Sequence, residues 1–197
     1  MAVPCQVDPL ILLERLLCYV ENLSTINCSE VNIQDLFYMK LALKEAASAG
    51  EAQEIPVGAV VVYRGEVIGR GHNRREQLQS PVAHAEILAL QEAASRLRSW
   101  RLCDCTLYVT LEPCIMCVGA VLQARIPRLV FGCLDPKGGA VESLYRLCDD
   151  SRLNHSVAVT SGVLADDCGQ ILSRFFARMR EKKSTTTADS QLNPHSS

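Results

Sequence analysis

Residues 107–117 read LYVTLEPCIMC, and this stretch decides the fold. Its first half continues an apolar run that predicts a buried strand over residues 106–110. Its second half changes to a helical pattern, in which Pro113 suits the first turn. The spacing of Cys114 and Cys117, three residues apart, then places both thiols on one side of the helix start. The stretch therefore predicts a strand that leads directly into a helix carrying two thiols at its N-terminus.

A second short motif lies upstream, where residues 84–86 read HAE. It opens a run from Ala85 to Leu97 in which small and apolar residues recur on one face, as expected of a helix packed on a core. His84 and Glu86 therefore also lie at a helix N-terminus. The helix dipole there favours thiolate over thiol in any nearby cysteine and adds positive field to a bound metal ion.

Together the two motifs supply three ligands of the kind zinc prefers, His84, Cys114 and Cys117. Three protein ligands leave the fourth tetrahedral position open for water, which indicates a catalytic rather than a structural site. Glu86 is then a free carboxylate able to move protons, and we predict it as the catalytic residue.

The alternative is a closed zinc knuckle or a pair of buried thiols. A closed site needs a fourth protein ligand, which the sequence allows from Cys103, Cys105 or Cys133. That alternative gives Glu86 no role, because a closed site needs no proton carrier.

Composition limits the class of protein. The chain has 197 residues, of which 48% are hydrophobic and 21% charged, so it is long enough for one domain with a substantial core. It contains 10 cysteines, yet its first residues lack the basic region of a secretory signal. The apolar run at residues 10–13 is too short to span a membrane. We therefore expect a cytoplasmic protein with reduced or metal-bound thiols and no membrane partner.

The patterns predict three parts. Residues 1–31 form an N-terminal extension with a short helix at about 10–21, residues 32–183 form the enzymatic domain, and residues 184–197 form a disordered, Ser/Thr-rich tail.

Within the domain we expect strands at about 56–63, 66–71, 106–110, 128–133 and 157–161. Helices are expected at about 33–49, 85–97, 113–124, 141–147 and 165–183. Strands that alternate with helices in this way predict an α/β fold, a three-layer α/β/α sandwich around a five-stranded mixed sheet.

The last predicted helix carries a local positive charge. The net charge of the chain is −2, but residues 174–183 hold five basic residues and one acid. Such a segment either contacts phosphates or is a solvated helix end whose cations suit the dipole, and charge alone favours the second interpretation. Phe175 and Phe176 are adjacent, so one is expected to face the core and the other is free to face outward.

The spacing H-x-E…P-C-x-x-C is the signature of zinc-dependent nucleobase deaminases. With its motifs on these elements, the chain resembles the cytidine deaminase superfamily, and within it the bacterial tRNA-specific adenosine deaminases, over residues 35–180. The resemblance is carried by the stretches 56–60, 71–74, 83–87, 107–117, 135–140, 154–155, 162–165 and 175–176. At Val141 and Glu142 the chain departs from the small residues usual in the family.

The resemblance implies a cytidine deaminase-like fold and the hydrolytic conversion of adenosine to inosine at the wobble position of a tRNA anticodon. It also implies one zinc ion per chain, an anticodon stem-loop as partner, and a homodimer. Matching positions assign the zinc ligands to His84, Cys114 and Cys117, the proton shuttle to Glu86, a hydrogen bond with the flipped base to Asn73, and places near the RNA to Asn154 and Phe176.

Two other functions stay open at this point. A free-base or nucleotide deaminase acting on guanine, cytosine or deoxycytidylate would share the same motifs. A non-catalytic, zinc-stabilised RNA-binding protein would share the cysteines and the basic helix, but it would have no need of Glu86.

Overall fold

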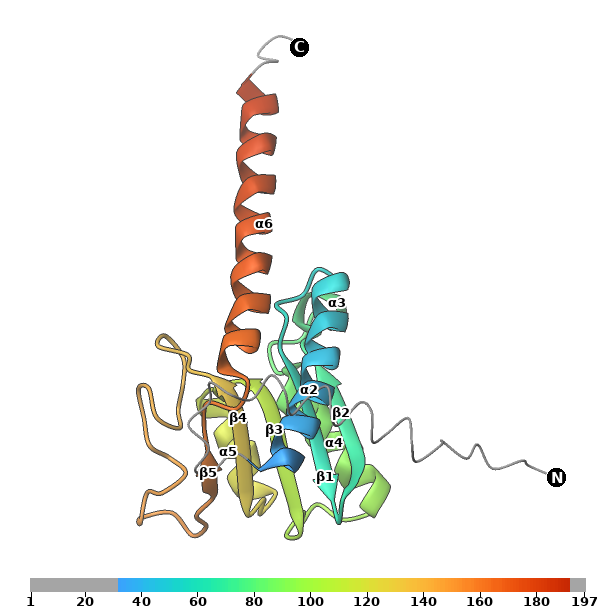
Figure 1. The fold of residues 1–197 in the computed structure, drawn as a ribbon, viewed down its shortest axis with the longest axis vertical. Coiled ribbons are helices and arrows are strands. Elements are labelled where there is room, and N and C mark those ends of the chain that lie inside the picture. Colours follow the sequence, from blue (N-terminus) through green and yellow to red (C-terminus); the bar gives the residue numbers. More distant parts are fainter. Residues whose placement is uncertain (1–31, 192–197) are drawn as a thin grey trace, which may run out of the picture. The chain divides into compact units, whose positions relative to one another are not determined.

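The computed structural model describes residues 32–191, with side chains as far as residue 182. A five-stranded sheet in the order β2-β1-β3-β4-β5 forms its centre (Figure 1). The strands are β1 Gly58–Tyr63, β2 Glu66–His72, β3 Cys105–Leu111, β4 Arg128–Cys133 and β5 Ala158–Thr160. β1 pairs antiparallel with both β2 and β3, whereas β3, β4 and β5 run parallel. The predicted mixed sheet is therefore confirmed.

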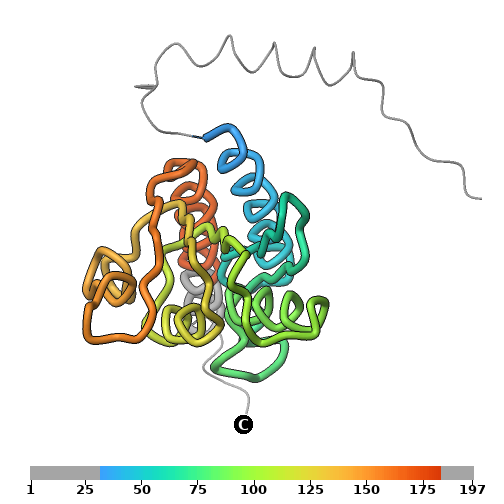
Figure 2. Tube along the Cα trace, turned by 90° about the horizontal axis from the view of Figure 1, so that it is seen from below, coloured from blue at the N-terminus to red at the C-terminus, as the bar shows by residue number. Residues whose placement is uncertain are grey.

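Helices cover both faces of this sheet. α2 (Ile33–Glu51) and α6 (Ala165–Gln191) pack on one face, and α4 (Ala85–Leu97) packs on the other, where it also contacts α5 (Ile115–Gln123). The view in Figure 2 separates the two helix layers, with the sheet between them. The predicted three-layer α/β/α sandwich is confirmed. α3 (Arg75–Leu78) is a single short turn of helix in the loop between β2 and α4.

The strands alternate their side chains between two apolar clusters, one on each face. In β3, Leu107 and Val109 belong to the cluster under α4 and α5, while Tyr108 belongs to the cluster under α2. β4 repeats the pattern with Phe131 on the first side and Val130 on the second. This two-sided burial is typical of a sheet with helices on both faces, and it explains why the strands read as continuous apolar runs.

A buried ion pair ties α2 to the sheet. Asp35, only 2% exposed, accepts hydrogen bonds from both terminal nitrogens of Arg128, at 2.8 and 2.7 Å, and from the Tyr108 hydroxyl at 2.8 Å. Burial opposes ionisation of Asp35, but the hydrogen bonds from Arg128 and Tyr108 outweigh it and hold the pKa of that carboxyl below its usual value. The bidentate geometry sets the position of α2 across β3 and β4.

Close packing of β2 against α4 depends on Gly71. A Cβ atom at this position would lie 2.1 Å from the Ala85 carbonyl oxygen and 2.7 Å from the Ala89 nitrogen. No side chain fits there, so glycine lets the first turn of α4 lie directly on the strand. That contact fixes where His84 and Glu86 stand.

Two expected helices differ in the structure: one starts later than predicted, and the other is absent. Pro113 lies before the helix rather than in its first turn, since Cys114 is the N-cap of α5. The helix expected near residues 141–147 is absent, and a series of turns takes its place. The backbone N–H groups of Val141, Glu142 and Ser143 point to the carboxylate of Glu112, so a tertiary acceptor organises this segment.

Two helix ends also differ. α2 continues through Gly50 to Glu51. α6 continues past Lys183 to Gln191, where no proline or glycine interrupts the chain. The short helix predicted at residues 10–21 lies outside the described residues. Of the predicted disordered tail, residues 184–191 continue α6, and residues 192–197 lie outside the described residues. No helix in the described part of the chain is long and apolar enough to cross a membrane.

Candidate active site

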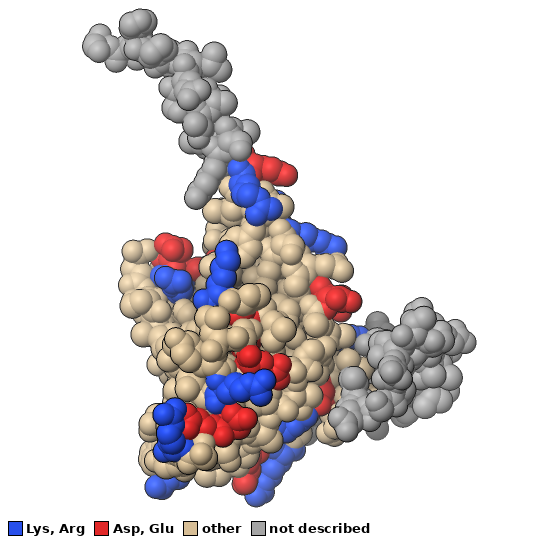
Figure 3. Space-filling model, turned by 90° about the vertical axis from the view of Figure 1, so that its left-hand side faces the viewer, with Lys and Arg blue, Asp and Glu red and all other residues tan. Residues whose placement is uncertain are grey.

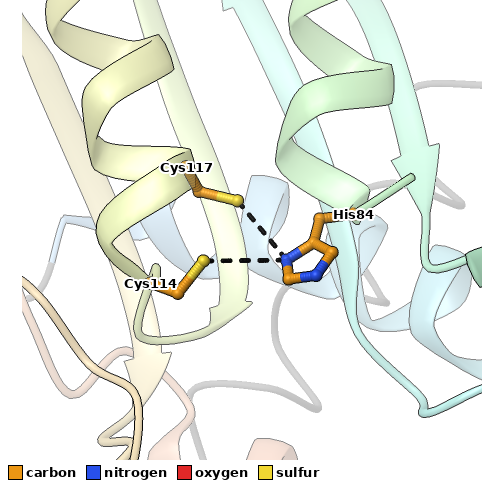
Figure 4. Close-up of side chains that lie close together, drawn as sticks. All are labelled: His84, Cys114 and Cys117. Carbon is orange, nitrogen blue, oxygen red and sulfur yellow. Dashed lines mark hydrogen bonds between the residues drawn. The ribbon is translucent and has the colours of Figure 1, made fainter. Parts of the chain in front are cut away.

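The structure brings His84, Cys114 and Cys117 together, as Figure 4 shows. The Nδ1 atom of His84 lies 3.8 Å from the sulfur of Cys114 and 3.6 Å from that of Cys117. One ligand atom from each of the three residues lies within 4.8 Å of the others. The group therefore has the size and the donor atoms of a site for a single metal ion.

The local backbone explains this convergence. His84 is the N-cap of α4 and Cys114 is the N-cap of α5, and both have extended backbone dihedrals. Neither side chain caps its own helix by a hydrogen bond, so both are free to face each other. The positive ends of two helix dipoles meet at this point and stabilise anionic sulfur.

The pKa values of the two thiols are shifted in opposite directions. Hydrogen bonding with Cys117 lowers the pKa of Cys114 to about 3, although burial opposes it, and His84 adds to the effect. The same contact with Cys114, together with burial, raises the pKa of Cys117. A thiol with a lowered pKa beside a second thiol and an imidazole suits a divalent cation, because such an ion binds thiolates and neutral imidazole.

Within residues 32–182, the group contains no fourth histidine, cysteine, aspartate or glutamate ligand. Cys103 is exposed and Cys105 is part of the apolar core. Cys133 instead directs its thiol to the carbonyl oxygen of Thr110 at 3.5 Å. A closed site built on one of these three cysteines is therefore wrong for this structure.

Glu86 is a buried carboxylate beside the group but not part of it. It lies in the first turn of α4 and is only 4% exposed. Burial raises the pKa of its carboxyl, whereas the nearby His84 works in the opposite direction. His84, Glu86 and Cys114 line one cavity of about 160 Å³, which gives Glu86 access to whatever enters it.

Asn73 lines the cavity at Glu86, whereas Phe176 lines a second cavity that shares Asn73 with it. Asn73 follows β2, is 6% exposed, and donates its backbone N–H to the Val57 carbonyl at 3.0 Å. It lines both the cavity at Glu86 and a second cavity of about 400 Å³, to which Phe176 contributes. Phe175 is buried while Phe176 is 43% exposed, so the two faces of α6 divide the aromatic pair.

Asn154 of the same chain does not lie at the cavity that contains Glu86. Its side-chain oxygen accepts a hydrogen bond from Arg125 at 2.7 Å. Arg125 follows α5 and precedes β4, so it stands at the opposite end of the sheet from the end of β3 that leads to Cys114. A place for Asn154 near RNA stays a prediction.

Six further residues line the cavity at Glu86 and have no assigned role in the sequence analysis: Ile55, Val57, Arg75, Leu111, Glu112 and Asp135. Glu112 is the most deeply buried of the charged ones, at 2% exposure. Burial opposes its ionisation, but hydrogen bonds from Glu142, Ser143 and Asp135 outweigh it and bring its pKa to about 2. A charged residue directly before Pro113, between an apolar strand and an apolar helix, is the signal that points to it.

Comparison with known proteins identifies relatives of this chain among the deaminases. The family model of the MafB19-like deaminases matches residues 33–180. The tRNA-specific adenosine deaminase of Bacillus subtilis is 53% identical over 150 residues, which cover 76% of this chain and 93% of the relative. A solved structure from a study of A-to-I editing by tRNA:A34 deaminases is 48% identical, with a TM-score of 0.67, and covers 69% of this chain and 99% of the other.

A more distant solved structure, the guanine deaminase of Nitrosomonas europaea, is 22% identical with a TM-score of 0.64 and covers 89% of this chain and 97% of the other. At that identity the likeness shows a shared fold alone. The match to the family model and the identity to the bacterial relatives decide the family: the chain belongs to the MafB19-like deaminases and, within them, to the tRNA-specific adenosine deaminases.

Proposed function

We propose that the protein hydrolyses adenosine to inosine at the wobble position of a tRNA anticodon, with zinc as cofactor. The observation that carries the proposal is the placement of a His/Cys/Cys group and a buried, non-ligand Glu86 on one cavity. The identity of 53% to a tRNA-specific adenosine deaminase selects the substrate among the deaminations that such a site supports.

The donor set fits zinc. One imidazole nitrogen from His84 and two sulfurs, from Cys114 and Cys117, are ligands that zinc prefers, and three protein ligands are the number found in catalytic zinc sites. Binding of the metal ion requires both thiols to lose their protons. When bound, zinc supplies a water activated for attack near neutral pH.

The residues of the chain then account for the proton transfers. Glu86 accepts a proton from the attacking water and delivers protons to the purine ring and to the leaving amine, so that water and adenosine become inosine and ammonia. Burial, which raises the pKa of Glu86, helps it to hold a proton during the reaction. Asn73, at the junction of the two cavities, is placed to donate or accept a hydrogen bond with the base.

The exposed surface of α6 supplies cations for the RNA backbone. Arg174 and Arg178 are exposed, and the side chains of Arg180 and Lys182 follow on the same helix. On the face drawn in Figure 3, basic side chains lie along the upper part of the molecule, with acidic side chains beside some of them. Phe176, which lines the larger cavity from this helix, is placed to stack on a base.

Replacing Arg174 and Arg178 together with alanine should weaken binding of a wobble-adenosine stem-loop and leave the rate of the bound complex near wild type. If each arginine binds one phosphate, the slope of log affinity against log salt falls by about one unit for each arginine replaced. Binding measured at two salt concentrations checks this. Replacing exposed Arg64, at the far end of β1, is the matched control, and equal affinities of the double variant and wild type at both concentrations would remove α6 from the interface.

Inosine formation decides between the proposed function and a free-base deaminase. The zinc-loaded protein is expected to convert a wobble-adenosine stem-loop and to leave free guanine, free cytosine and deoxycytidylate unchanged under the same conditions. Product analysis by chromatography measures all four. Rapid turnover of a free base with none on the stem-loop would overturn the substrate, while the absence of any deamination by the metal-loaded protein would favour a binding protein.

We also propose a homodimer in the cytoplasm. The outer face of α4 and α5 exposes Trp100, Ile115 and an apolar hollow lined by Leu90 and Ala120, a surface suited to protein contact. Sedimentation at micromolar concentration should give twice the chain mass of 21.6 kDa. A purely monomeric species at that concentration would contradict the dimer.

A further inference from the structure

Glu112 uses both oxygens of its carboxylate to hold one loop. One oxygen accepts the backbone N–H groups of Val141, Glu142 and Ser143, at 3.0, 2.7 and 2.9 Å. The other accepts the backbone N–H of Asp135 at 3.0 Å and the hydroxyl of Ser143. A single buried side chain thus satisfies donors from both ends of the segment 135–143.

The backbone reinforces this connection. The Ala140 nitrogen donates to the Pro113 carbonyl at 2.8 Å, and Cys114 forms an isolated antiparallel bridge with Gly139. Gly139 lies so close to Glu112 that a Cβ atom there would stand 2.2 Å from a carboxylate oxygen. The loop and the segment that carries Cys114 are therefore packed as one unit, and only glycine at 139 permits it.

The held loop reaches the reaction cavity through Asp135. This residue lines the cavity with His84, Glu86 and Cys114. Its own side chain accepts the Lys137 N–H at 3.0 Å, and its carbonyl accepts the Gly139 N–H at 2.9 Å, so the turn around it is locally closed. These local bonds do not determine where the turn lies relative to the cavity. The hydrogen bond from the Asp135 N–H to the Glu112 carboxylate determines that position.

We propose that Glu112 is a positioning residue of the active site: its carboxylate holds loop 135–143 against the Cys114 segment and thereby sets the cavity wall that the substrate meets. The proposal rests on the proposed function for the identity of that substrate. Glu112 touches no reacting atom in this role. It acts through Asp135 and the backbone of the loop.

The chemistry requires a carboxylate here. In Glu112→Gln, the amide oxygen can keep the three N–H groups at Val141, Glu142 and Ser143, but the amide NH₂ then faces the Asp135 N–H. Two donors oppose each other, and the Asp135 amide loses its acceptor, while the Ser143 hydroxyl can turn and accept. The substitution is close to isosteric, so it releases Asp135 with little change in packing.

The test compares zinc-loaded wild type, Glu112→Gln and the matched control Glu66→Gln, an exposed glutamate at the start of β2. We expect Glu112→Gln to keep its zinc and to change kcat by less than about threefold. KM for the stem-loop should rise by about tenfold, in line with the loss of the acceptor of one part-buried N–H. Hydrogen exchange should be faster at residues 135–143 of this variant and unchanged elsewhere. Glu66→Gln should match wild type in all three measurements.

Ser143→Ala serves as a milder variant, since it removes one donor to Glu112 and keeps every backbone bond. It should also raise KM for the stem-loop, but by a smaller factor than Glu112→Gln does. Unchanged KM and unchanged exchange in both variants would overturn the proposal. Loss of zinc in parallel with activity would also overturn it, because Glu112 would then support the metal ligands rather than the loop. A wild-type protein inactive on the stem-loop contradicts the proposed function alone, since the exchange comparison uses no substrate.

Discussion

Glu86→Ala is expected to yield a folded, zinc-binding protein whose turnover is lower by a factor of roughly 10²–10⁴, the usual contribution of one general acid–base group. Glu86 is not part of the ligand group, so the metal content should stay at one per chain. The loss should appear in kcat, because the carboxylate moves protons during the reaction. Inosine formation under saturating stem-loop, together with metal analysis, measures both quantities.

Glu92→Ala is the matched control for this experiment, since it removes an exposed carboxylate from the same helix. It should retain wild-type turnover. Glu86→Gln, which preserves the shape of the buried side chain, should lose activity as Glu86→Ala does. Turnover near wild type in either Glu86 variant would show that another group carries the protons.

Cys114→Ala is expected to abolish activity through loss of the metal. Two protein ligands, His84 and Cys117, would remain, fewer than the three of a catalytic zinc site. Because zinc binds the folded state, the variant should also unfold at a lower temperature than the zinc-loaded wild type. Metal analysis after dialysis and thermal unfolding with and without added zinc measure the two effects.

The control for Cys114→Ala is Cys103→Ala, which removes an exposed thiol outside the ligand group. This variant should keep both its zinc and its unfolding temperature. A full complement of zinc in Cys114→Ala would contradict the assignment of the ligands. A difference in unfolding temperature that persists without zinc would indicate that Cys114 also contributes to packing.

The bounds of helices and strands could be predicted from local sequence wherever a single periodic pattern of apolar residues was clear. α4 runs from Ala85 to Leu97 and β4 from Arg128 to Cys133, as predicted. In these segments apolar periodicity, a polar start and a clear end agree with one another. The expected helix near residues 141–147 failed because the donors of that segment bind Glu112, which lies about thirty positions away in the chain.

The division of the aromatic pair in α6 was also predictable, since neighbouring residues on a helix point in different directions. Which of the two faces the core depends on how the helix lies on the sheet. The structure buries Phe175 and exposes Phe176 at the cavity. For Asn154 the sequence carries no information about distance, and the fold places it with Arg125 at the far end of the sheet.

By itself, the sequence determined the layered α/β class, the family resemblance and the candidate ligand and proton-carrying residues, because each depends on residue type and short spacing. Tertiary structure alone decided that His84 meets Cys114 and Cys117, that no described fourth ligand closes the group, and that Glu112 and Asp35 are held by distant partners. The physical reason is that buried charges are satisfied by donors from elsewhere in the chain, and local sequence patterns do not record which donors the fold brings to them.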